Sequence, residues 1–180
     1  MHKFLLKILI FSIITFNIFA ETNPIIPQLI PDSSLVGKGK YTFLFMKIFD
    51  IELYAPQGKF DKNKPYALEL DYHRNLKGKS IAEKTIEKIS EQSTKVSTEQ
   101  LNSWQQQLTT ILPDVKQGSS LIGVYTPSIK QTKFFNNEQV LLGSIDGEDF
   151  ANHFFGIWIG EDSSEPQLRK SLLGINSYFI

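Results

Sequence analysis

The apolar residues in the first half of this chain predict strands. The segment 41–55 (YTFLFMKIFDIELYA) is rich in aromatic and β-branched residues and is too long for one flat strand, so we expect two strands or one strongly bent strand. Its apolar residues fall on both faces, which is typical of a strand inside a covered sheet. Residues 66–74 alternate, with Leu68, Leu70 and Tyr72 on one face, and predict a half-buried strand.

Two helices are expected next. Ser80 and Glu83 have the spacing of a reciprocal capping box, and Ser97 and Gln100 repeat it before a second helix that ends at Pro113. The two helices carry apolar stripes that predict a helical layer. The stripes are Ile81, Thr85, Ile86 and Ile89 in the first helix, and Leu101, Trp104, Leu108, Ile111 and Leu112 in the second.

The pattern then returns to strands. Residues 121–125 and 133–135 are short β segments, and Asn136-Asn137 can supply the positive φ angles of a tight hairpin into residues 139–145. The sheet is therefore expected to grow by antiparallel addition.

The last third is expected to be helical. Asp146 or Asp149 can cap a helix that ends at Gly160, and a final helix should run from Ser164 to Gly174. Strands gathered into two blocks around a helical pair, without regular β-α alternation, indicate an α+β layered fold.

The N-terminus has the pattern of a secretory signal. Lys3 and Lys7 form a basic start. An apolar stretch follows over residues 8–19, and Ala20 is a small residue at the expected cleavage site. A membrane-spanning helix needs about 20 apolar residues, so we expect cleavage and export to the periplasm. The alternatives are an uncleaved amphipathic or buried helix, and secretion to the medium.

We therefore divide the chain into a signal peptide (1–20), a proline-containing arm that does not pack (21–34), and one domain (35–180).

Composition narrows the possible chemistry. The absence of cysteine from the sequence excludes disulfides, thiolate metal sites, cysteine nucleophiles and an acylated cysteine. The chain carries 19 basic and 19 acidic residues, and loss of the two signal lysines leaves a slightly acidic domain, which disfavours a nucleic-acid partner. The sequence lacks G-x-S-x-G, H-E-x-x-H, P-loop and G-x-G-x-x-G motifs, so no catalytic residue and no cofactor are assigned.

Two groups of polar residues receive structural interpretations. His73 and His153 are far apart, and we expect His73 to be an ordinary strand histidine and no metal to be bound. The charged residues between Lys77 and Glu91 are expected to form the solvated face of a helix.

The chain is unusually rich in aromatic residues. A bulky core explains them most simply, and an apolar ligand cleft is the alternative. The residues concerned are Phe43, Phe45, Phe49, Tyr54, Phe134, Phe135, Phe154, Phe155 and Trp158.

Four segments resemble the bacterial chalcone isomerase-like family. They are residues 37–56 (GKGKYTFLFMKIFDIELYAP), 67–81 (ALELDYHRNLKGKSI), 118–125, and above all 150–174 (FANHFFGIWIGEDSSEPQLRKSLLG). The resemblance covers nearly the whole chain after the signal. It implies an open-faced β-sandwich, in which a large antiparallel sheet is covered by a layer of helices.

The resemblance also locates the positions used by the plant enzymes, which close a flavanone ring. Their threonine falls on Phe49, their tyrosine on Ile81 and their asparagine on Lys88, while their arginine falls near position 37, where Lys38 or Lys40 can substitute. Tyr54 and Thr85 are too far along the chain to restore the missing donors.

Three hypotheses follow. The first is an exported, non-catalytic protein that binds a small apolar or fatty-acid-like ligand, as related members of the superfamily do. By that analogy Lys40, Arg74 or Lys88 would hold an anionic head, and Phe49 and Ile81 would line the tail. The second is a chalcone isomerase-type intramolecular lyase, and the third is an interaction module with a filled core.

Overall fold

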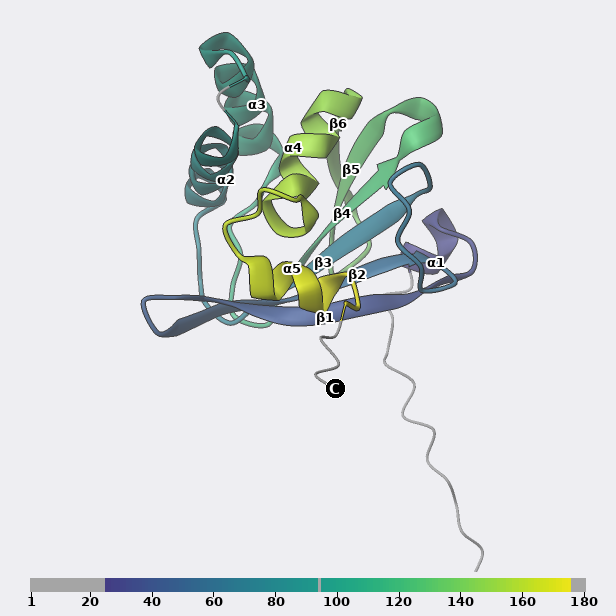
Figure 1. The fold of residues 1–180 in the computed structure, drawn as a ribbon. Coiled ribbons are helices and arrows are strands. Elements are labelled where there is room, and N and C mark those ends of the chain that lie inside the picture. The colour runs from purple at the N-terminus through teal and green to yellow at the C-terminus, as the bar shows by residue number, and fades with distance from the viewer. Residues whose placement is uncertain (1–24, 94, 176–180) are drawn as a thin grey trace, which may run out of the picture.

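A computed structural model describes residues 25–93 and 95–175. These residues form one six-stranded antiparallel sheet in which every strand pairs with its neighbour in the sequence (Figure 1). The strands are β1 (Ser33–Phe43), β2 (Met46–Pro56), β3 (Tyr66–Tyr72), β4 (Ser120–Thr126), β5 (Gln131–Asn136) and β6 (Leu141–Asp146). The helices are α1 (Ile25–Leu29), α2 (Gly78–Gln92), α3 (Thr98–Ile111), α4 (Glu148–Ile159) and α5 (Pro166–Leu172), with a 3-10 turn, η1, at Pro127–Ile129. The expected α+β class is confirmed.

Helices α2 to α5 lie together on one face of the sheet (Figure 1). The main core lies between these helices and the inward side chains of the strands, with Leu53, Leu68, Leu108 and Phe155 almost fully buried. The segment 41–55 divides into the end of β1 and β2, which confirms the expected pair of strands. The predicted signal peptide lies outside the described residues. Within those residues, no helix has the length and apolar character needed to cross a bilayer.

The expectation of an unpacked arm is wrong for residues 25–34. Ile25 and Ile26 of helix α1, and Ile30 directly after it, are buried against the opposite face of the sheet, and β1 already begins at Ser33. Apolar side chains from β2 to β5 complete this second, smaller core. They are Tyr54, Ala67, Ile122, Val124 and Phe135. The proline-rich composition concealed three isoleucines that bury apolar surface as effectively as any strand residue.

Helix α5 packs directly on β1 because two glycines face it. A Cβ atom at Gly37 would lie 2.1 Å from the carbonyl oxygen of Ser171, and one at Gly39 would lie 2.3 Å from Leu168 Cδ1. Alternation along β1 then directs Lys38 and Lys40 to the outer face, where both are exposed.

Helix α2 begins at Gly78, two residues before the expected start, and its cap comes from a distant residue. Asp114 Oδ1 accepts a hydrogen bond of 3.0 Å from the Gly78 amide, so Ser80 and Glu83 do not form the cap. Half of the second predicted capping box is confirmed, because the Ser97 Oγ accepts a hydrogen bond of 3.2 Å from the Gln100 amide.

Three later boundaries also differ from expectation. Gly147, with φ 109°, is the N-cap of α4, so neither candidate aspartate caps that helix. Helix α5 begins at Pro166 after Glu165, rather than at Ser164. In the β5–β6 turn the positive φ belongs to Gln139, while the Asn136 side chain accepts from two backbone amides and orders the turn.

Candidate functional site

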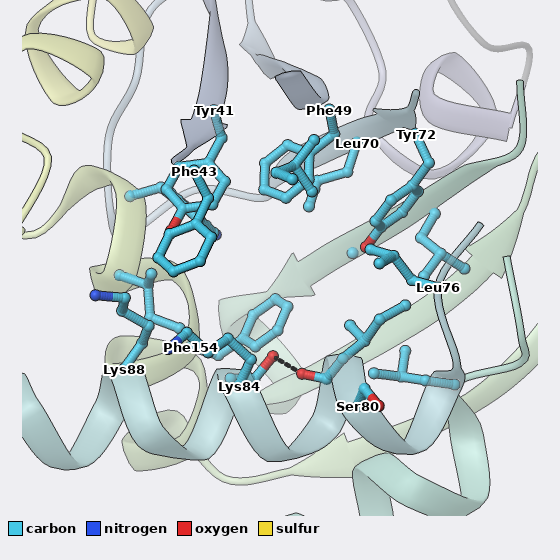
Figure 2. A pocket seen from close by; sticks show the side chains of 18 of the residues that line it. Tyr41, Phe43, Phe49, Leu70, Tyr72, Leu76, Ser80, Lys84, Lys88 and Phe154 are labelled. Carbon is cyan, nitrogen blue, oxygen red and sulfur yellow. Dashed lines mark hydrogen bonds between the residues drawn. The ribbon is translucent and has the colours of Figure 1, made fainter. Parts of the chain in front are cut away.

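A cavity of about 440 Å³ lies between the inner face of the sheet and helices α2 and α4 (Figure 2). Its lining is predominantly aromatic and aliphatic. The sheet contributes Tyr41, Phe49, Leu70, Tyr72 and Phe134, helix α2 contributes Ile81 and Thr85, and α4 contributes Phe154 and Trp158. A cavity of this size falls in the range that holds small-molecule ligands.

Stacked aromatic rings form one wall of the cavity. Tyr41 and Phe49 are paired across the β1–β2 hairpin, and their ring centroids lie 5.2 Å apart with an interplanar angle of 23°. Trp158 of α4 meets both rings edge to face, at 5.3 and 5.5 Å. Tyr72 meets Phe49 in the same manner at 5.5 Å. These contacts hold the rings in fixed positions, so the wall is preformed.

Hydroxyl groups also border this apolar space, among them those of Tyr72 and Thr85. Burial raises the pKa of Tyr72 well above its ordinary value, so its phenol remains neutral and can donate a hydrogen bond. The Thr85 hydroxyl already donates to the carbonyl oxygen of Ile81 at 2.8 Å.

Lysines from α2 lie at one edge of the cavity. Ser80, Lys84 and Lys88 follow at intervals of one helical turn, and all three border the cavity (Figure 2). Lys84 Nζ lies 5.7 Å from the ring centroid of Phe43. Lys84 also pairs with Glu87.

The Lys88 side chain is only 19% exposed, and its Nζ lies 2.9 Å from Glu91 Oε2. The hydrogen bond and the charge of Glu91 raise the pKa of Lys88, so Lys88 stays protonated at this edge of the cavity, as one half of an ion pair. Tyr41 lies near enough to Lys88 to contribute to its electrostatic environment.

The structure brings together three of the five predicted ligand-binding residues. Phe49, Ile81 and Lys88 all line the cavity, whereas Lys40 and Arg74 do not. Lys40 lies on the outer face of β1, and Arg74 lies exposed in the loop after β3. The strand residue that faces the cavity is the neighbour of Lys40, Tyr41.

Sequence reasoning missed Tyr41, Tyr72 and Lys84 as site residues. Tyr72 shares the strand face that alternation assigned to Leu68 and Leu70, and Leu70 also borders the cavity. The four-residue spacing from Lys88 points to Lys84. Reading the charged residues of α2 only as a solvated face was therefore incomplete, because Lys84 and Lys88 also border the cavity.

Some of the aromatic residues belong to a bulky core and others to an apolar cleft, so each of the two explanations accounts for part of them. Phe155 belongs to the inner core, and Tyr54 and Phe135 belong to the smaller outer core. Others border the cavity, while Phe45 is fully exposed. The bordering residues are Phe43, Phe49, Phe134, Phe154 and Trp158.

His73 and His153 lie apart from the cavity. His73 Nε2 is 2.7 Å from Asp50 Oδ2, and His153 Nδ1 is 2.8 Å from the carbonyl oxygen of Asp149. In residues 25–93 and 95–175, no three His, Cys, Asp or Glu side chains are grouped so that they could hold a metal ion.

Comparisons with known proteins agree with this architecture. The model of the chalcone isomerase-like family matches residues 32–174. An uncharacterized protein of Haemophilus influenzae is 27% identical over 140 residues, which are 77% of this chain and 67% of that relative. A solved Arabidopsis thaliana fatty-acid binding protein has the same fold, with a TM-score of 0.63 and 14% identity over 79% of this chain and 87% of that one.

Proposed function

This chain belongs to the chalcone isomerase-like family, and on that basis we propose that it binds a small amphipathic molecule with an apolar tail and an anionic head, such as a fatty acid. The observation that carries the proposal is the preformed apolar cavity with Lys88 and Lys84 at its edge. The similarity in fold to a plant fatty-acid binding protein supports it.

The tail would lie against the aromatic wall, because transfer of methylene groups from water to an apolar cavity contributes about 0.8 kcal/mol each. The head would lie near Lys88, whose charge is maintained by Glu91. A carboxylate hydrogen-bonded to a charged lysine forms a stronger contact than one between neutral groups.

Two positions favour binding over ring closure. They are the positions at which plant chalcone isomerases carry hydroxyl donors for the reaction. Phe49 and Ile81 offer carbon atoms to the cavity where those enzymes place hydroxyl donors, and the Thr85 hydroxyl is engaged with the backbone of its own helix. We therefore expect no measurable conversion when a chalcone is added and its absorbance is followed. Turnover above the uncatalysed rate would favour the lyase.

The proposal includes a compartment, the periplasm. It is supported by Lys3 and Lys7, the apolar residues 8–19 and the small residue Ala20. Determining the N-terminus of the protein recovered from cells tests it, and a chain that begins at Glu21 in the periplasmic fraction is expected.

Native mass spectrometry of the protein purified from cells tests the binding proposal. We expect one apolar acid per chain, identified after extraction, and uptake of added palmitate by protein from which this ligand has been removed. Ile81→Trp should fill the cavity and reduce uptake at least tenfold, since Ile81 borders it. Ile129→Trp is the matched control, because Ile129 is exposed on η1. A ligand-free mass without uptake would favour the module with a filled core.

A further inference from the structure

The tip of the β1–β2 hairpin exposes a continuous apolar patch. Phe43 is 46% exposed, Leu44 69%, Phe45 102% and Met46 38%, and the four residues are consecutive. The other large exposed apolar residues of the described chain lie outside this hairpin. Figure 1 shows this hairpin, at the left of the view, extending past the ends of the other strands. Such a patch on a projecting element marks an interaction site more often than a packing defect.

The backbone of the tip makes the apolar residues harder to explain by folding alone. Phe43 pairs with Met46, so Leu44 and Phe45 form a two-residue turn, with φ of 46° and 65°. Turns with two positive φ angles strongly prefer Asn-Gly, and bulky side chains are unfavourable there. Two large, exposed apolar residues in a strained turn therefore point to a role outside the fold.

We infer that this hairpin tip inserts into the surface of an anionic lipid membrane. Lys47 lies one residue after the apolar patch, Lys40 is exposed on the same hairpin, and Lys84 lies over the Phe43 ring at 5.7 Å. Carboxylates also lie nearby, since Lys47 pairs with Asp50 and Lys84 with Glu87. An apolar tip bordered by lysines matches the acyl region and the anionic headgroups of a membrane.

The shape of the tip argues against a second copy of the chain as the partner. A stable dimer buries about 800 Å² on each partner, which is far more than the side chains of one two-residue turn and its flanking pair can supply. Insertion into lipid needs only that these side chains leave water, and a projecting tip can enter a membrane that the remaining surface does not touch.

The tip is continuous with the cavity. Phe43 and Lys84 both border the cavity, and Phe43 is also part of the exposed patch (Figure 2). A docked hairpin would therefore place the edge of the cavity next to the lipid surface, where an amphipathic ligand could enter with little exposure to water. This role in ligand transfer rests on the proposed function, whereas insertion of the tip does not.

Vesicle flotation of the full chain as recovered from cells tests the inference. The probe is phosphatidylethanolamine vesicles containing phosphatidylglycerol, compared with pure phosphatidylcholine vesicles. The decisive variant combines Leu44→Asn with Phe45→Gly, which removes the apolar tip and gives the turn its preferred residues, so the fold should be retained or stabilised. Ile129→Ser is the matched control, because Ile129 is an exposed apolar residue outside the hairpin.

We expect the wild type and Ile129→Ser to float with the anionic vesicles and to be released from them as salt is added. The double variant should bind at least roughly tenfold more weakly. Equal flotation of the double variant, or equal binding to phosphatidylcholine, would overturn the inference. Loss of a wild-type dimer in the double variant, without lipid, would assign the tip to self-association instead. Palmitate uptake measured without vesicles reports separately on the cavity, and we expect the double variant to retain it.

Discussion

Tyr41 stacks on Phe49, its direct partner across the first hairpin, with 5.2 Å between the ring centroids. This pairing fixes the face of β1 that borders the cavity. One residue earlier, Lys40 pairs in register with Asp50 and faces away. The cationic end of the cavity is therefore built from helix α2 and not from β1.

Neutralising Lys88 should weaken the binding of an anionic ligand. Lys88→Gln removes a charge that borders the cavity, and we expect the Kd for palmitate to rise roughly tenfold, the equivalent of about 1.4 kcal/mol. Lys40→Gln is the control, with no expected change in Kd. Isothermal titration with palmitate measures both, and an equal effect of the two substitutions would contradict this site.

A methyl group at Gly37 should be strongly destabilising. Gly37→Ala would place its Cβ against the backbone of α5, 2.1 Å from Ser171 O and 2.5 Å from Leu172 O, so the helix would have to move. We expect a loss of about 2–4 kcal/mol in the free energy of unfolding, measured by urea denaturation.

Gly156→Ala provides the control for this substitution. Gly156 lies within α4, and a Cβ there meets nothing within 4 Å. We expect it to stabilise the protein by about 0.5–1 kcal/mol, because alanine is the better helix former. Equal stabilities for the two alanine variants would mean that α5 does not hold β1.

The contact of Asp114 with α2 should make stability depend on pH. The hydrogen bond from Lys77 and that from the Gly78 amide lower the pKa of Asp114. Its stabilising contribution is therefore present above the ordinary aspartate pKa, about 3.9, and is lost as the pH falls through the lower value of the folded state. Asp114→Ala should reduce Tm by about 2–4 °C at neutral pH and have little effect in strong acid.

Thermal melts across this pH range compare Asp114→Ala with Asp162→Ala, which changes an exposed acid after α4. A pH-independent deficit in Asp114→Ala would indicate a packing role and contradict the proposed cap.

Helix α1 should contribute measurably to stability. Ile26 is fully buried against the outer face of the sheet, so Ile26→Ala should cost about 2–5 kcal/mol in the free energy of unfolding. Gln28→Ala on the exposed side should change it by less than about 0.5 kcal/mol. Similar denaturation midpoints for both variants would restore the interpretation of residues 25–34 as an unpacked arm.

The sequence predicted local features better than those that join distant residues. Ser97 and Gln100 are three residues apart, and their cap was found as expected. Asp114 caps α2 from 36 residues away, which no local pattern reveals. Neighbouring residues of a strand such as Lys40 and Tyr41 occupy opposite faces, but which of them faces the helices depends on the packing of Gly37 and Gly39 against a helix near the other end of the chain.

The cavity residues were found by a different route. Phe49, Ile81 and Lys88 emerged from the family resemblance, because hydrophobic periodicity alone does not distinguish a filled core from one that leaves room for a ligand. The exposed turn at Leu44 and Phe45 was not anticipated, since an apolar run such as YTFLFMKIF looks like a buried strand until its hairpin is placed.

The contact between α5 and β1 also has a consequence for how the protein is made. The strands can pair in the order of synthesis, because each one adds to its predecessor. The first strand, however, receives its covering helix only when residues 166–172 have emerged from the ribosome. We therefore expect nascent chains that stop before α5 to expose the inner side of β1 and to be the forms that chaperones and proteases recognise.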